Sequence, residues 1–250
     1  FGRFSHEGAW VAPVQEGAPI VIYTGDDSRR EYMYKFVSKA AWSEADRNGG
    51  LSAGDKYLDE GTLYVAVFND DGTGAWKALS TANMDLAGTH SYDDNGTVYQ
   101  YNFASDAEVL ASARLAADVV GATPMDRPEW ATVHPNTGDV YLTLTNGNSS
   151  NRPSTDLDGA NPRAVNSNGH IIRWREEAGD HAATSFEWDI FLFGSSADAS
   201  SDYNVSGLTA DNEFSSPDGL FIDPRGVIWI QTDDGSSGIR GKTNNQMLVA

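Results

Sequence analysis

The stretch "PEWATVHPNTGDVYLTLTNG", residues 128–147, carries the pattern that decides the fold. An acid, Glu129, precedes an apolar run, a turn built on Pro135 and Gly138, and a second apolar run that ends in Thr and Asn. Two such runs joined by turn residues predict a β-hairpin.

The same pattern recurs in "HEGAWVAPVQEGAPIVIYTGDD" (6–27) and "PDGLFIDPRGVIWIQTDDG" (217–235). The leading acids Glu7, Glu129 and Asp218 are 122 and 89 residues apart. A single propeller blade takes roughly 40 to 50 residues, so further blades and insertions are expected between the three hairpins. The repeat therefore predicts an all-β chain made of several blades of a β-propeller.

The composition supports this fold class, because Gly (25 residues), Asn, Asp, Thr and aromatic residues are plentiful while helix formers are sparse. Four further segments are predicted to be strands: 31–38, 61–68, 169–176 and 186–193. One inserted helix is predicted to begin at the capping box of Ser105 and Glu108 and to end at Gly121. Polar, Gly- and Asn-rich loops are expected at 43–55, 89–97 and 146–169.

The charge of the chain limits the class of partner. Asp and Glu number 36 against 17 Lys and Arg, so the net charge is −19, which repels nucleic acid and anionic membranes and favours cations. The chain has no Cys, hence no disulfide and no thiolate metal ligand, and it has no apolar run of about 18 residues that would cross a membrane. The first residues, "FGRFSHEGAW", show no signal-peptide pattern.

In radial β architectures the first strand of each blade lines a central channel, so Glu7, Glu129 and Asp218 are expected to face one another there. Three converging acids repel unless they are protonated or bridged by a metal ion. Second acidic or amide residues, Asp26, Asn146 and Asp233, follow the second strand of each hairpin. Such oxygen ligands suit Ca²⁺, and clustered carboxylates also accept Fe³⁺ or Mn²⁺.

The alternative is that Asp and Asn simply make turns at these places, which is the preferred interpretation for Asn146, Asp27 and Asp234. His6 is adjacent to Glu7 and is the weakest ligand candidate. Motifs of serine hydrolases, P-loops, dinucleotide-binding folds and H-E-x-x-H metalloproteases are absent from the sequence.

The turn "GATPMDRPEW" (121–130) contains the candidate catalytic residue. Pro124 and Pro128 stiffen the turn, and Arg127 lies two residues before Glu129. A guanidinium so placed could hold a tetrahedral oxyanion through two parallel hydrogen bonds. The alternative is a salt bridge of Arg127 with Asp126 or Glu129.

With these residues identified, the sequence resembles the PhoX-type alkaline phosphatases. The matching pieces run through nearly the whole chain: "GRFSHEGA" (2–9), "YTGDD" (23–27), "YMYKFVS" (32–38), "LDEGTLYVAVFNDDGTGAW" (58–76), "GATPMDRPEW" (121–130), "LTLTN" (142–146), "IIRWRE" (171–176) and "SPDGLFIDPRGVIWIQTDD" (216–234).

The resemblance implies a six-bladed β-propeller, a mixed calcium and iron (Fe³⁺) cluster, hydrolysis of phosphate esters, and a secreted or periplasmic location reached by the twin-arginine route. It matches Glu7, Asp26 and Glu129 to metal ligands and Arg127 to a phosphate-binding arginine. A further ligand is expected from the third hairpin, with Asp218 favoured over Asp233. A monomer is expected, with a phosphate ester as its substrate and no nucleic acid or membrane as partner.

The family is longer at both ends and has an upstream cysteine iron ligand, so residues 1–250 resemble a single central propeller section. Two other functions stay open: a calcium-dependent lactonase-like propeller, which "PDGLFIDPRGVIWI" also suits, and a non-catalytic propeller in which metal ions only add rigidity.

Overall fold

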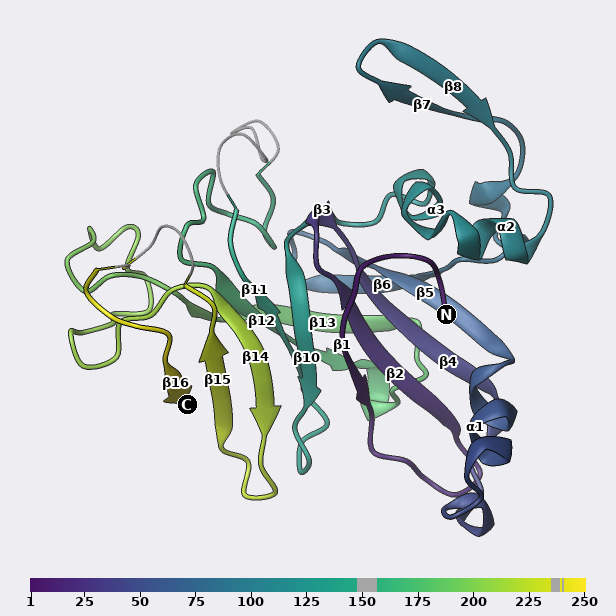
Figure 1. The fold of residues 1–250 in the computed structure, drawn as a ribbon, viewed down its shortest axis with the longest axis horizontal. Coiled ribbons are helices and arrows are strands. Elements are labelled where there is room, and N and C mark those ends of the chain that lie inside the picture. Colours follow the sequence, from purple (N-terminus) through teal and green to yellow (C-terminus); the bar gives the residue numbers. More distant parts are fainter. Residues whose placement is uncertain (148–156, 235–238, 240) are drawn as a thin grey trace.

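The structure is a computed structural model that describes residues 1–147, 157–234, 239 and 241–250. The described chain is mostly β with few helices, which confirms the predicted class (Figure 1). No helix within these ranges is both long and apolar enough to cross a membrane.

The first part of the chain forms an antiparallel meander. Its strands are β1 (His6–Val11), β2 (Pro19–Asp26), β4 (Met33–Ala41), β5 (Gly61–Phe68) and β6 (Thr73–Ala78). Each pairs with the next. The short strand β3 (Arg29–Glu31) leaves this sheet and pairs with β9 (Met125–Asp126), which directly precedes the next meander.

The second meander consists of β10 (Pro128–Val133), β11 (Val140–Leu144), β12 (His170–Glu176) and β13 (Ser185–Phe193). Its last strand, β13, pairs with β6, so the two meanders form one nine-stranded sheet. The two edge strands of that sheet, β1 and β10, contact each other, and the sheet therefore curls into a nearly closed wall (Figure 1).

A third, smaller sheet contains β14 (Pro217–Ile222), β15 (Ile228–Thr232) and β16 (Met247–Val249). Its first strand, β14, lies beside β10. The first strands of all three units thus lie next to one another, as expected from the repeat.

The three predicted hairpins are confirmed as β1 with β2, β10 with β11 and β14 with β15. Each contains a one-residue shift of register near its start. The shifts lie at Glu7/Trp10, Pro128/Ala131 and Pro217/Leu220. A β-bulge re-aims side chains, so each bulge changes the direction of the leading acid.

The helical part differs from the prediction. The segment from Ser105 to Gly121 forms two helices, α2 (Asp106–Ala111) and α3 (Ala113–Val119), because Ser112 between them has non-helical φ and ψ of −121° and 41°. The predicted cap is present, since the Ser105 side chain accepts a hydrogen bond from the Glu108 N–H.

Two of the predicted loops contain regular structure. Residues 43–55 include a 3₁₀ turn (Glu44–Asp46) and most of helix α1 (Leu51–Leu58), which is anchored by the buried Tyr57 against Trp42. Residues 89–97 belong to the projecting hairpin β7 (His90–Asp94) and β8 (Thr97–Tyr101). Further 3₁₀ turns occupy Met84–Leu86 and Glu177–Gly179. Of the predicted loop 146–169, residues 148–156 lie outside the described residues.

The core enclosed by the curled sheet is aromatic and contains one charged pair. Lys35 of β4 and Glu176 of β12 are almost fully buried, with Nζ and Oε1 3.3 Å apart. Glu176 also accepts hydrogen bonds from the Tyr23 hydroxyl and the indole N–H groups of Trp76 and Trp174. This network joins the first meander to the second.

Candidate active site

Three backbone hydrogen bonds define equivalent positions in the three hairpins. In each, a carbonyl before the first strand accepts the N–H of a residue after the second strand. The pairs are Ser5 with Asp27 (2.9 Å), Arg127 with Thr145 (3.2 Å) and Ser216 with Asp233 (2.9 Å). Glu7, Glu129 and Asp218 each follow two residues after these carbonyls, so the leading acids occupy the same place in the three hairpins.

The same bonds show which second acid corresponds to Asp233. The equivalent residue is Asp27, because both donate their N–H to the matching carbonyl. Asp26 lies one residue earlier, and successive side chains of a strand point to opposite faces. The sequence prediction chose Asp26 as a ligand and assigned Asp27 to a turn.

Glu129 and Asp218 form the buried centre of the site. Glu129 is 2% exposed, and its carboxyl lies next to that of Asp218. Burial first, and then the contact with Asp218, raise the pKa of Glu129 to about 9. Burial also raises the pKa of Asp218, and the neighbouring charges of Asp233 and Asp27 act in the same direction.

Arg127 lies against these acids. Its Nη2 is 3.1 Å from Glu129 Oε1 and 2.9 Å from Asp27 Oδ1, and it donates a 3.0 Å hydrogen bond to Asp27 Oδ2. The salt bridge with Glu129 that the sequence left open is therefore present. Asp126, the other partner considered, accepts a hydrogen bond from Asn166 (3.0 Å).

Two properties of Arg127 go beyond a structural salt bridge. Its φ is +58°, in the left-handed region that costs free energy for a residue with a side chain, and Ser216 at the equivalent position has φ +54°. Its ion pairs use Nη2, and the residues that the structure describes supply no hydrogen-bond partner for Nε or Nη1. Arg127 thus keeps free donors while Asp27 and Glu129 contact its Nη2.

Glu7 is connected to this group by Trp130, the neighbour of Glu129. Glu7 Oε1 accepts a 3.0 Å hydrogen bond from Trp130 Nε1, and Gly8 packs against the Trp130 ring. The backbones of β2 and β10 are also close, because a Cβ atom on Gly25 would lie 2.2 Å from the Pro128 carbonyl oxygen. Only glycine fits there.

Asp26 has a different environment. It is fully buried, and both of its carboxylate oxygens bind the guanidinium of Arg114 from α3, at 2.6 and 2.7 Å. Its Oδ1 also accepts the Ser5 N–H. The predicted role of Asp26 as a metal ligand therefore stays a prediction, and its carboxylate already has a cationic partner.

The donor set fits a hard cation in chemical type. Glu129 Oε1 and Asp27 Oδ1 are buried oxygens without a hydrogen bond, and the Glu129 and Asp218 carboxyls lie close together. Carboxylate oxygens are the ligands that calcium and oxidised iron accept. Among the described residues, however, no three His, Cys, Asp or Glu side chains are already spaced around one ion position.

The raised pKa of Glu129 gives a pH prediction for the metal-free protein. Its pKa is about 9 when folded, against about 4.3 in an unfolded chain, so the folded state holds more protons between these values. We therefore expect the free energy of unfolding to fall as pH rises from about 5 to about 9. Asp218, whose pKa is also raised, adds to the same slope.

The measurement is urea unfolding in chelator across this pH range. Glu129→Gln should flatten the dependence of the unfolding free energy on pH. Glu187→Gln, a change at an exposed position of β13, should leave this dependence as in the wild type. If the unfolding free energies of Glu129→Gln and the wild type changed with pH in parallel, the raised pKa of Glu129 would be contradicted.

Sequence reasoning missed Asp27, Thr145 and Arg114. Counting residues from each hairpin turn could have aligned Asp27 with Asp233, because the ladder continues past the last strand residue. Nothing in the sequence indicates Arg114, since it comes from a helix 88 residues away from its partner Asp26.

Two comparisons with known proteins found a match for this chain. The chain matches the family described as alkaline phosphatase PhoX over residues 1–249. It is similar to the solved structure "Pseudomonas fluorescens PhoX in complex with vanadate, a transition state analogue", with 38% identity and a TM-score of 0.82. The similarity covers 100% of this chain and 43% of that one, so the chain spans less than half of that relative. No curated protein sequence matches the chain.

Proposed function

The chain belongs to the alkaline phosphatase PhoX family, and from this premise we propose that it carries part of a metal-dependent site that hydrolyses phosphate esters. One observation carries the proposal: Arg127, in a strained backbone conformation and with free donors, lies beside the buried acids Glu129 and Asp218. The similar Pseudomonas protein binds vanadate, a transition-state analogue, and an arginine beside metal ligands is suited to the same tetrahedral charge.

Arg127 would bind the phosphoryl group through the N–H groups that its ion pairs leave free. Asp27 and Glu129 hold the guanidinium in place, so little side-chain freedom would be lost on binding. As the bond between phosphorus and the ester oxygen breaks, negative charge on the phosphoryl oxygens would strengthen the hydrogen bonds to Arg127.

Calcium and iron are proposed as the cofactors. Glu129 and Asp218 would hold them, with Asp233 and Asp27 next to this pair, and Glu7 and Asp26 remain predicted ligands. Bound metal ions would neutralise the phosphoryl oxygens and lower the pKa of an attacking oxygen. They would also favour the charged form of Glu129, whose pKa is now raised first by burial and then by the neighbouring acids.

The finer features of the architecture are part of the same proposal. We propose that the three units are blades of a six-bladed propeller, because their first strands lie side by side and each unit is an antiparallel meander. A secreted or periplasmic monomer acting on a phosphate ester is consistent with the acidic composition of the chain.

The test combines elemental analysis with assays on p-nitrophenyl phosphate and on an aryl lactone. Bound calcium and iron together with phosphatase activity are the expected result. Calcium with lactonase activity alone would favour a lactonase-like propeller, and metal without hydrolysis of either ester would favour a binding propeller. Either outcome would reject the proposal.

Removing the metals is expected to lower the melting temperature, because the carboxylates that share them would then repel one another. The measurement is thermal unfolding at pH 8 with and without excess EDTA, with metal loss verified. Glu129→Gln should reduce the shift, since it removes one of the carboxylates that would bind the metals in the loaded protein. An equal melting temperature with and without metal would argue against metal ligation by this group.

A further inference from the structure

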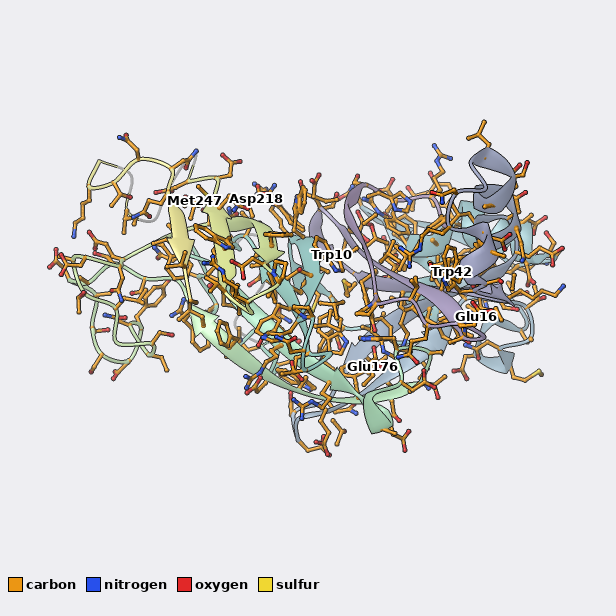
Figure 2. The ribbon with its side chains drawn as sticks, turned by 90° about the horizontal axis from the view of Figure 1, so that it is seen from below. Trp10, Glu16, Trp42, Glu176, Asp218 and Met247 are labelled. Carbon is orange, nitrogen blue, oxygen red and sulfur yellow. The ribbon has the colours of Figure 1, made fainter. Side chains whose placement is uncertain are left out.

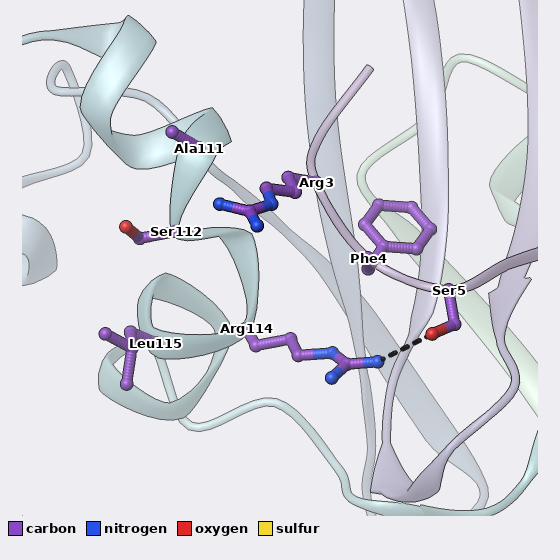
Figure 3. Close-up of a pocket in the computed structure, with 7 residues that line it drawn as sticks. All are labelled: Arg3, Phe4, Ser5, Ala111, Ser112, Arg114 and Leu115. Atoms are coloured by element: carbon purple, nitrogen blue, oxygen red, sulfur yellow. Dashed lines mark hydrogen bonds between the residues drawn. The ribbon is translucent and has the colours of Figure 1, made fainter.

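Arg114 is the side chain that connects the helical part of the molecule to the candidate site. It extends from α3 to the start of the chain, where it reaches Ser5 (Figure 3). Its guanidinium binds both oxygens of Asp26 at 2.7 and 2.6 Å and donates to Ser5 Oγ (3.2 Å) and Ser28 Oγ (3.0 Å). Glu31 Oε2 is 3.4 Å from its Nε.

The partners of Arg114 surround Asp27. Asp26 and Ser28 are its two neighbours in the chain, and Ser5 supplies the carbonyl that accepts the Asp27 N–H. Asp26 is fully buried, so its carboxylate depends on Arg114 for its cationic partner. One guanidinium thus fixes the backbone on both sides of Asp27 without touching its side chain.

Asp27 in turn holds Arg127 through both of its carboxylate oxygens. The order of contacts is therefore Arg114, the Asp26 to Ser28 turn, Asp27, and Arg127. We propose that Arg114 is a positioning residue, which holds Asp27 where it orients the Arg127 guanidinium toward a phosphoryl group. This inference rests on the proposed function of Arg127.

A purely structural role would be simpler, since an arginine that joins a helix to a sheet stabilises the fold. The two roles differ in what they predict. If Arg114 is only structural, its replacement should lower stability and change nothing else. If Arg114 is a positioning residue, its replacement should also weaken binding of a phosphoryl analogue, because a small displacement of a catalytic group can lower the rate strongly.

The experiment measures kcat/KM with p-nitrophenyl phosphate, the Kd of vanadate, metal content and melting temperature in the metal-loaded protein. Arg114→Gln is expected to lower kcat/KM about tenfold and to weaken vanadate binding by a similar factor, at unchanged metal content. Arg114→Lys keeps the charge beside Asp26, so it is expected to fold normally and to lose less kcat/KM than Arg114→Gln. Some loss is still expected, because lysine lacks the planar fork.

A double-mutant cycle with Asp27→Asn isolates the route of the effect. If Arg114 acts through Asp27, Arg114→Gln combined with Asp27→Asn should be about as active as Asp27→Asn alone. Arg175→Gln is the matched control, because Arg175 binds both oxygens of Asp139 in an equivalent bidentate pair on β12. It should leave kcat/KM and vanadate binding unchanged.

Wild-type kcat/KM and vanadate affinity in both Arg114 variants would overturn the inference while leaving the proposed function intact. Losses that multiply in the double variant would also overturn it. A wild-type protein that neither hydrolyses the ester nor binds vanadate would reject the proposed function, and the positioning role with it.

Discussion

Replacing Lys35 by Met is expected to lower the free energy of unfolding by about 3–5 kcal/mol, because Glu176 would either stay charged in the core without a cation or take up a proton at a cost in free energy. Lys35 also donates to the carbonyl oxygens of His181 (3.0 Å) and Ala183 (2.7 Å), which would lose their partner. Burial lowers the pKa of Lys35 to about 8, so the ammonium is still charged at pH 7. Urea unfolding at pH 7 measures the loss.

Two variants separate the buried charge from ordinary packing. Lys39→Met, on the same strand, removes an exposed ion pair with Glu60, in which the two side chains are 74% and 67% exposed, and it should leave the stability close to that of the wild type. Lys35→Met with Glu176→Gln removes both charges and keeps an acceptor for the indoles, so it should recover part of the loss. A single Lys35→Met variant as stable as Lys39→Met would show that Glu176 is not held as an ion.

The position of this network explains its effect. Lys35 belongs to the first meander and Glu176 to the second, and the two meanders also meet at the pairing of β6 with β13 and at the contacts of β10 with β1 and β2. Figure 2 shows Glu176 well apart from Asp218 of the candidate site. Loss of stability is therefore expected without direct damage to the site.

The hairpins were predictable because each carries two apolar runs at a fixed distance around a turn, and this is local information. The equivalence of Glu7, Glu129 and Asp218 followed from the same repeat. The β7 and β8 hairpin was missed although its turn, Asn95 and Gly96, has the positive φ angles typical of an Asn-Gly turn, 51° and 88°. Its strands are exposed and mix polar residues with Tyr92, Val98 and Tyr99, so no regular apolar alternation indicated them.

The choice between Asp26 and Asp27 depended on the register of the hairpin, which residue counting could supply, and on the contact with Arg114, which is not local. Both are acids after the second strand, and only the register of the hairpin and the arrival of Arg114 distinguish them. The break between the two helices at Ser112 was also not indicated by local sequence signals. Capping signals defined the ends of the helical segment, whereas its interior bends where α3 turns toward Ser5.

Arg127 and Glu129 were predicted as site residues partly because the prolines limit the backbone around them. What the sequence left open was whether Arg127 only balances charge. The structure adds that Arg127 has two carboxylate partners, a positive φ and free donors. Ser216 has a similar φ at the equivalent position, so the positive φ belongs to the start of the hairpin. What distinguishes Arg127 is that Asp27 and Glu129 hold its guanidinium in one place.

Arg127→Lys is therefore expected to lower kcat/KM for p-nitrophenyl phosphate by tenfold to a hundredfold while metal content persists. Lysine keeps the charge beside Asp27 and Glu129 but lacks the planar fork, and a charge-assisted hydrogen bond is worth roughly 1.5 to 3 kcal/mol. Arg127→Ala should lower kcat/KM further. The measurement is steady-state kinetics at pH 8 with metal content determined on the same samples.

The matched control is Arg173→Lys, because Arg173 forms a bidentate pair with Asp189 on the outer face of the sheet and lies outside the proposed machinery. It should keep wild-type kcat/KM. If Arg127 served only to pair with Asp27 and Glu129, Arg127→Lys would retain most activity, and Arg127→Ala would lose stability or metal. Near wild-type turnover by Arg127→Ala at full metal occupancy would therefore exclude a phosphoryl-binding role and assign the guanidinium to charge balance alone.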